Sequence, residues 1–152
     1  MVAKMGNAGE ACTSANRFYV QASVADEFSR RLADRMSALN LGPGTGETTE
    51  VGPRVNEDIL FKVDRLVRPA IAEGAQAIVG GSRPEREGFY CEPTVLMNVH
   101  PDAAILREEI FGPVAPIVTF RQEAQAVALA NATEHGLVGS ASARHWSSAW
   151  SV

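Results

Sequence analysis

Residues 57–82 read EDILFKVDRLVRPAIAEGAQAIVGGS and join a helical pattern directly to a strand pattern. The apolar residues of the first part recur at helical spacing, at Leu60, Val63, Val67 and Ile71. This spacing predicts a helix over residues 57–73 that Pro69 kinks or weakens and that ends at Gly74. The run AQAIV at 75–79 predicts a short buried strand, which two glycines and a serine end.

The same alternation of helix and strand continues on both sides of this stretch. Residues 24–39 predict a helix whose apolar face consists of Val24, Phe28, Leu32, Met36 and Leu39. A further helix is predicted over 123–132, and strands are predicted over 17–21, 90–99, 117–120 and 137–143. Helices that alternate with strands predict an α/β fold, with a mainly parallel sheet flanked by helices.

Composition and charge narrow the classes of function. The chain has 152 residues, 45% hydrophobic and 21% charged, with a net charge of −4, which suits one globular unit. Charged residues interrupt every apolar run, and the first residues lack a signal-peptide core, so neither a membrane span nor secretion is expected. The acidic balance argues against nucleic acid as a partner. Cys12 and Cys91 are too far apart for a CxxC motif, which favours a reduced, cytoplasmic protein.

Two patterns that resemble binding motifs do not fit their templates. Gly42, Gly44 and Gly46 follow a helix rather than a strand, and their spacing matches neither a dinucleotide-binding loop nor a P-loop. We therefore expect a surface loop there. The three histidines lack the spacing of metal ligands, so we predict no metal site and solvated loop positions for them.

Cys12 lies in a run of small residues, NAGEACTSANR at 7–17. A helix-compatible stretch follows it, so Cys12 could lie near a helix N-terminus, where backbone N–H groups favour the thiolate. Small neighbours leave room for a substrate carbonyl, and the same N–H groups could stabilise the oxyanion formed by attack on it. Alternatively, Cys12 could be a small buried residue without a catalytic role. We interpret Cys91 in this second way.

Residues 107–114, REEIFGPV, place two adjacent carboxylates before an aromatic residue and a Gly-Pro turn. Glu108 and Glu109 should point to opposite faces of an extended chain, so we do not expect them to act as an acid/base pair. One of them could accept hydrogen bonds from cofactor hydroxyls, and Phe111 could form a flat apolar wall. A charged strand end before a turn explains these residues equally well.

Taken together, these motifs resemble the aldehyde dehydrogenase superfamily. The cysteine motif of that family corresponds to NAGEACTSANR, and its cofactor motif corresponds to EEIFGPV at 108–114. The segments between them follow the family's order, namely VGPRVNED (51–58), KVDRLVRPAIAEGAQAIVGG (62–81) and GFYCEPTVL (88–96). Within the superfamily the sequence is most similar to succinate-semialdehyde dehydrogenases, above all in GEACTSANRFYV and EEIFGPVAPIVTF.

The resemblance implies a covalent mechanism that uses NAD or NADP. The Cys12 thiolate would attack an aldehyde, and water would hydrolyse the thioester that remains after hydride transfer to the cofactor. The backbone N–H of Cys12 would form part of the oxyanion hole. The other roles that the resemblance implies are Glu109 on the nicotinamide ribose, Phe111 in the pocket of the ring, Lys62 near the cofactor ribose, and Ala11 and Thr13 on the substrate.

Two features separate this sequence from the family pattern. Gly6 lies where members that prefer succinate semialdehyde commonly carry an arginine, and glycine cannot pair with a substrate carboxylate. In the family, the Rossmann-like cofactor domain, the general-base glutamate and the oxyanion-hole asparagine precede the cysteine motif, and an oligomerisation tail follows the matched region. We therefore expect residues 1–152 to form part of the catalytic domain of a homo-oligomeric enzyme, and to be inactive alone.

Two other functions remain open on the sequence. Cys12 could serve a cysteine hydrolase or acyltransferase with His100 or His135 as its base, although no spacing supports either pair. The chain could also be a non-catalytic remnant that acts as an interaction module. Trp146 and Trp150 motivate this second alternative, because two large aromatic residues near a chain end need a surface to pack against.

Overall fold

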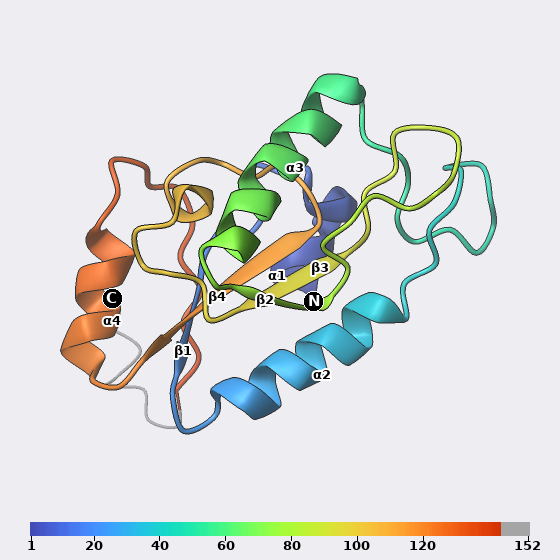
Figure 1. Cartoon of the computed structure of the whole chain (residues 1–152). Helices are drawn as coiled ribbons and strands as arrows, with labels where there is room; N and C mark the ends of the chain where they lie inside the picture. The colour runs from blue at the N-terminus through green and yellow to red at the C-terminus, as the bar shows by residue number, and fades with distance from the viewer. Residues whose placement is uncertain (144–152) are drawn as a thin grey trace.

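The computed structural model describes residues 1–143 and folds them into a four-stranded sheet with helices on both sides (Figure 1). The elements in chain order are α1 (Val2–Met5), the 3-10 turn η1 (Gly6–Gly9), β1 (Phe18–Gln21), α2 (Ala25–Ser37), α3 (Glu57–Ala72), β2 (Gln76–Val79), β3 (Thr94–Met97), the 3-10 turn η2 (Ala104–Leu106), β4 (Val114–Phe120) and α4 (Glu123–Asn131). The strand order in the sheet is β1-β4-β3-β2.

Three of the four strands are parallel. β4 pairs in parallel with β1 on one side, where Phe18 lies opposite Ile117, and with β3 on the other, where Thr94 lies opposite Val114. β2 runs antiparallel to β3. The prediction of an α/β fold with a mainly parallel sheet flanked by helices is confirmed.

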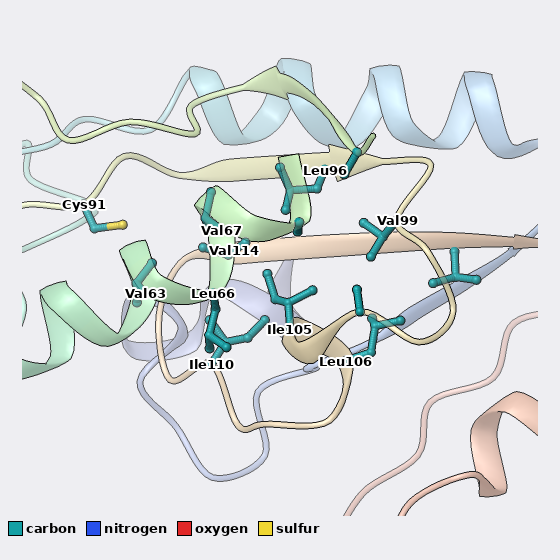
Figure 2. Close-up of a cluster of buried hydrophobic side chains, with 14 of the residues drawn as sticks. Val63, Leu66, Val67, Cys91, Leu96, Val99, Ile105, Leu106, Ile110 and Val114 are labelled. Carbon is teal, nitrogen blue, oxygen red and sulfur yellow. The ribbon is translucent and has the colours of Figure 1, made fainter. Parts of the chain in front are cut away.

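β4 is the centre of the core, because its side chains alternate between two apolar clusters on opposite faces of the sheet. The cluster on the α3 side includes Leu66, Leu96, Val114 and Val118 (Figure 2). The cluster on the α2 side includes Leu32, Met36, Ala115 and Ile117. Burial of one such aliphatic side chain stabilises the fold by about 1.5–3 kcal/mol, so these two clusters account for the position of the sheet between the helices.

The buried face of α2 differs from the predicted one. Val24 and Phe28 are 47% and 38% exposed, although Leu32 and Met36 are buried as expected. The complete buried face consists of Ala25, Ser29, Leu32, Ala33 and Met36. Since three of these residues are small, the helix presents a smooth surface on which the sheet can pack closely.

The α3 helix continues through Pro69 to Ala72, and Gly74 follows it with a φ of 110°, which matches the predicted end. Its predicted face is mostly confirmed. Ile71 is the exception, since it is 36% exposed. Leu66 and Ala70, which lie beside Val63 and Val67 on the same side of the helix, are buried instead.

β2 is an edge strand, and the prediction that it is buried is wrong. Residues 76–78 are exposed, and the strand pairs on one side only, with β3. A continuous apolar run such as AIV does not show whether a strand lies at the edge or in the centre of a sheet, because that position depends on distant segments.

The predicted strand over residues 137–143 is absent, since these residues form no strand in the described chain and Leu137 is 71% exposed. The glycine and serine residues there leave too few apolar side chains to hold a strand on the sheet. His145, Trp146 and Trp150 lie outside the described residues. Within residues 1–143, no helix combines the length and the apolar character that crossing a membrane requires.

Candidate active site

Cys12 lies between η1 and β1 and is exposed. Residues 11–14 form a turn, in which the Ser14 N–H donates to the Ala11 carbonyl at 2.9 Å. The chain then enters β1, so the prediction that Cys12 lies at a helix N-terminus is wrong, because the helical turns precede it. The environment of the Cys12 thiol is therefore set by the loop around it, and not by a helix N-terminus.

The residues that were predicted to touch substrate surround this exposed thiol. Ala11 is half-buried and Thr13 is exposed, on either side of Cys12. Gly6, at the position where an arginine would bind a substrate carboxylate, is also exposed. The immediate sequence neighbours of Cys12 are therefore small or short side chains that leave the sulphur open to a ligand.

The loop before Cys12 has an unusual backbone. Asn7 and Ala8 adopt left-handed conformations, with φ of 47° and 54°, and Gly9 has a φ of 83°. Left-handed residues with a Cβ atom cost about 1–2 kcal/mol each, so contacts elsewhere must hold this loop. A Cβ atom at Gly9 would collide with the carbonyl oxygen of Gly112. Glycine thus allows the cysteine loop to touch the backbone of the EEIFGPV segment.

Asn16 makes a second connection between the two motifs. Its side-chain Nδ2 donates to the Glu108 carbonyl at 2.8 Å, and its Oδ1 accepts from the Ile110 N–H at 2.8 Å. One amide group therefore bonds the main chain on both sides of Glu109. Sequence analysis did not single out Asn16, because nothing in the sequence shows which distant backbone groups its side chain bonds.

The two adjacent carboxylates have different environments. Glu108 accepts two hydrogen bonds from Arg65 of α3, at 3.1 and 2.7 Å. These bonds lower the pKa of Glu108, and the charges of Arg65 and Lys62 act in the same direction. Glu109 is exposed, and among residues 1–143 no ion pair or side-chain hydrogen bond engages it. The structure thus leaves Glu109, and not Glu108, available to a ligand.

Lys62 and Phe111 flank this segment. Lys62 is half-buried on α3, and its effect on Glu108 shows that its charge lies on the side of the helix near residues 108–112. Phe111 is half-buried and has a left-handed φ of 52°, which is uncommon for an aromatic residue. Two of the three predicted cofactor residues, Glu109 and Phe111, thus lie in one short segment, and the charge of Lys62 acts on Glu108 of the same segment.

Arg54 is a buried residue that sequence analysis missed. It is only 2% exposed, and its Nη1 lies 3.0 Å from the Ala8 carbonyl and 3.2 Å from Oε1 of Glu10. Its Nη2 donates to the Gly52 carbonyl at 2.8 Å. The one signal in the sequence is Glu10 itself, an acidic residue close to Cys12 whose burial would require a cation.

Lys4 is a second buried cation near the loop. It is 2% exposed, and burial lowers its pKa to about 8. Its main-chain carbonyl accepts a hydrogen bond from Ser14 Oγ at 2.7 Å, and the Ala3 carbonyl accepts from the Ala15 N–H at 2.7 Å. The backbone of α1 is in this way bonded to the segment that follows Cys12.

Cys91 is buried, as predicted, and burial raises the pKa of its thiol to about 11. A thiol in this state is a poor nucleophile at neutral pH, so Cys12 and Cys91 are chemically distinct. The cysteine-hydrolase alternative receives no support. His100 and His135 are exposed in loops, and no hydrogen bond within residues 1–143 joins either one to Cys12. Across the same residues, no three histidine, cysteine or acidic side chains gather as metal ligands.

Comparison with known proteins gives a consistent set of relatives. The model of the Aldehyde dehydrogenase family matches residues 1–152. Succinate-semialdehyde dehydrogenase of Paenarthrobacter nicotinovorans is 51% identical over 137 residues, which are 90% of this chain and 30% of that protein. Succinate-semialdehyde dehydrogenase [NADP(+)] of Escherichia coli is 39% identical, over 90% of this chain and 28% of its own length.

A solved structure extends the similarity to the fold. The crystal structure of NAD-dependent aldehyde dehydrogenase from Sinorhizobium meliloti superposes with a TM-score of 0.91 at 40% identity, over 97% of this chain and 30% of that one. The chain therefore spans less than a third of the length of the relatives that it matches.

Proposed function

The chain belongs to the aldehyde dehydrogenase family, and from this we propose that Cys12 is the nucleophile in the NAD- or NADP-dependent oxidation of an aldehyde to a carboxylate. The observation that carries the proposal is the junction of two motifs distant in sequence. The Cys12 loop touches the EEIFGPV segment at Gly9 and Gly112, and Asn16 bonds the backbone around Glu109. A nucleophile and an exposed carboxylate thus share one region of the molecule.

In the first step, the sulphur of Cys12 attacks the carbonyl carbon of the aldehyde. A C–S bond forms, and the carbonyl π electrons move to oxygen, where the Cys12 backbone N–H is our candidate donor for the developing charge. When bound, a nicotinamide cofactor would supply the oxidising power for this step, in which the substrate carbon loses a hydride and the thiohemiacetal at Cys12 becomes a thioester. Water then cleaves the C–S bond of the thioester at Cys12, which releases a carboxylate and two protons and restores the thiolate.

The residues of the 108–112 segment fit a nicotinamide nucleotide. Glu109 is exposed and has no partner of its own within the described residues, so its carboxylate can accept hydrogen bonds from ribose hydroxyls. Phe111 offers a half-buried ring, and Lys62 supplies a cation whose charge acts on the neighbouring Glu108. We propose that these three residues hold the cofactor. One relative is named for NADP and one structure for NAD, so both cofactors stay within the proposal.

For the substrate, we propose an aldehyde of the succinate-semialdehyde type, because the similar proteins above carry that name. Ala11 and Thr13 would contact it beside the thiol. Gly6 supplies no charge for a substrate carboxylate, so a cation for that group has to come from another residue. We further propose that residues 1–152 are part of a catalytic domain of a homo-oligomeric enzyme in the cytoplasm, where an exposed free thiol such as Cys12 stays reduced.

The experiment combines cysteine protection with cofactor reduction. Iodoacetamide labelling of the 152-residue chain is followed by mass spectrometry, with and without succinate semialdehyde. We expect the aldehyde to slow labelling of Cys12 but not of Cys91, which serves as the internal control. Equal labelling of Cys12 with and without aldehyde would contradict its role as the nucleophile.

Reduced cofactor is measured by absorbance in parallel samples that contain succinate semialdehyde and NAD or NADP but no iodoacetamide. We expect no steady-state turnover from residues 1–152 alone. Turnover that persists in Cys91→Ser and disappears in Cys12→Ser would refute the expected inactivity and would support the nucleophile directly.

A further inference from the structure

Arg54 connects the loop before Cys12 to the segment before α3. Its Nη1 binds the Ala8 carbonyl at 3.0 Å and lies 3.2 Å from Glu10 Oε1, while Nη2 donates to the Gly52 carbonyl at 2.8 Å. Its own backbone N–H donates to the Phe89 carbonyl at 2.7 Å. The Arg54 side chain thus contacts both ends of residues 8–10 and connects them to the backbone at Gly52.

The burial of this pair makes the contacts mutually dependent. The side chains of Arg54 and Glu10 are 1% and 12% exposed. Removal of a guanidinium from water costs several kcal/mol, and only well-placed acceptors offset that cost. An apolar side chain of similar size would fill the same space without this requirement, so packing alone does not account for an arginine at this position.

The contacts also act at the point where the loop is strained. Ala8 has a left-handed φ of 54°, and its carbonyl is one of the acceptors of Arg54. The Glu10 N–H donates to the Asn7 carbonyl at 3.0 Å, which closes the turn directly before Ala11 and Cys12. A shift of residues 8–10 would therefore displace Gly9 from Gly112 and move the Cys12 thiol, which follows two residues after Glu10.

We propose that Arg54 is a positioning residue for the Cys12 nucleophile. It acts through the Ala8 carbonyl, which it holds in place, and through the Glu10 carboxylate, whose charge it neutralises two residues before Cys12. This inference rests on the proposed function in one respect, the role of Cys12 as a nucleophile. The contacts of Arg54 themselves involve neither aldehyde nor cofactor.

The test uses the full chain and four variants. Arg54→Met removes the guanidinium, and Arg54→Lys keeps its charge but not its forked geometry. The double variant Glu10→Gln/Arg54→Met removes both charges. Arg68→Met is the matched control, because Arg68 pairs with Asp64 at 2.9 Å on the exposed surface of α3.

Two readouts separate local positioning from general stability. Backbone hydrogen exchange is measured for peptides that cover residues 6–14 and 114–120, and iodoacetamide labelling is measured for Cys12 and Cys91 without aldehyde. In Arg54→Met we expect exchange over 6–14 to be about fivefold faster, with 114–120 unchanged. Cys12 labelling should be about threefold slower, because the unpaired Glu10 carboxylate disfavours the thiolate that reacts.

The other variants separate the change in hydrogen exchange over residues 6–14 from the change in Cys12 labelling. Arg54→Lys should label Cys12 at nearly the normal rate while exchange over 6–14 stays raised. The double variant should also restore labelling, because no charge remains unpaired, but it should not restore exchange, because the Ala8 contact is lost. Arg68→Met should change neither readout.

Two results would overturn the proposal. One is an Arg54→Met chain with unchanged exchange over 6–14 and unchanged Cys12 labelling. The other is acceleration of all peptides together with labelling of buried Cys91, which would make Arg54 a residue of general stability. Neither result depends on aldehyde protection of Cys12, so a failure of the proposed function is recognised separately.

Discussion

The centre of the sheet and the loop before Cys12 depend on different interactions. Val114, Ala115 and Ile117 of β4 are at most 1% exposed and pack against apolar side chains on both faces. In the loop 7–10, in contrast, Asn7 and Ala8 adopt left-handed conformations, and the loop is held by the contacts of Arg54 with Ala8 and Glu10, a turn hydrogen bond and one glycine contact. The sheet is stable because many equivalent contacts add up, whereas the loop depends on a few contacts that cannot replace one another.

The largest effect is expected from removal of apolar volume at the centre. Leu96 of β3 is fully buried, so Leu96→Ala should lower the free energy of unfolding by about 2–5 kcal/mol. Ile78→Ala on the exposed edge strand β2 is the control, and it should cost much less because Ile78 is 39% exposed. Urea unfolding measures both variants. Similar losses in the two would mean that β2 is part of the core.

A smaller effect with a local cause is expected at Gly9. Gly9→Ala adds a Cβ atom against the Gly112 carbonyl and places it at a φ of 83°, so we expect a loss of about 2–3 kcal/mol. Gly6→Ala is the matched control, because nothing lies within 4 Å of a Cβ at Gly6. Thermal unfolding compares the two. If both variants melt alike, the loop does not touch residue 112 in solution.

Asn16 tests whether the two motifs are joined by its side chain. Asn16→Ala removes two hydrogen bonds of 2.8 Å and should cost about 1–2 kcal/mol, with faster hydrogen exchange over residues 108–112. Asn131→Ala removes one exposed bond within α4 and should have little effect on either measurement. Unchanged exchange over 108–112 in Asn16→Ala would show that Glu109 is held by other contacts.

The smallest effect concerns the charge of Lys4. Because its folded pKa of about 8 lies below its ordinary value of 10.5, unfolding takes up a proton between these values. Stability should therefore rise with pH through this window, by about 1 kcal/mol between pH 8 and 9. Above about pH 9 the raised pKa of Cys91 opposes this rise, because the unfolded thiol ionises near its ordinary value of 9.0 while the buried thiol stays protonated. Unfolding curves at pH 8 and 9 should show the rise in the natural chain and not in Lys4→Met.

The sequence alone predicted the helices and the central strands well. The helices predicted over 24–39 and 57–73 are observed as α2 (Ala25–Ser37) and α3 (Glu57–Ala72), and β4 contains the predicted strand 117–120. These predictions succeeded because the apolar patterns reflect burial on a local scale. The exposed edge position of β2 and the missing strand at 137–143 could not be predicted in this way. Both depend on which distant segment, if any, lies beside them.

The site was predictable only where its residues form local motifs. Cys12 and Glu109 stood out in their motifs, and both are exposed in the structure. Arg54 and Asn16 had no such signal, since each acts on main-chain groups that are remote in sequence. The helix expected after Cys12 was wrong because small residues such as Ala11 and Ser14 are as compatible with a turn as with a helix.

The parallel pairing of β1 with β4 has a consequence for the order of folding. Asn16 and its partner Glu108 are 92 positions apart, and β4 follows Glu108 in the chain. Contacts with such a large sequence separation form late, because a long loop must first close. During synthesis, residue 12 is made before residues 108–112, so the cysteine loop lacks this partner segment until the chain has grown past Pro113.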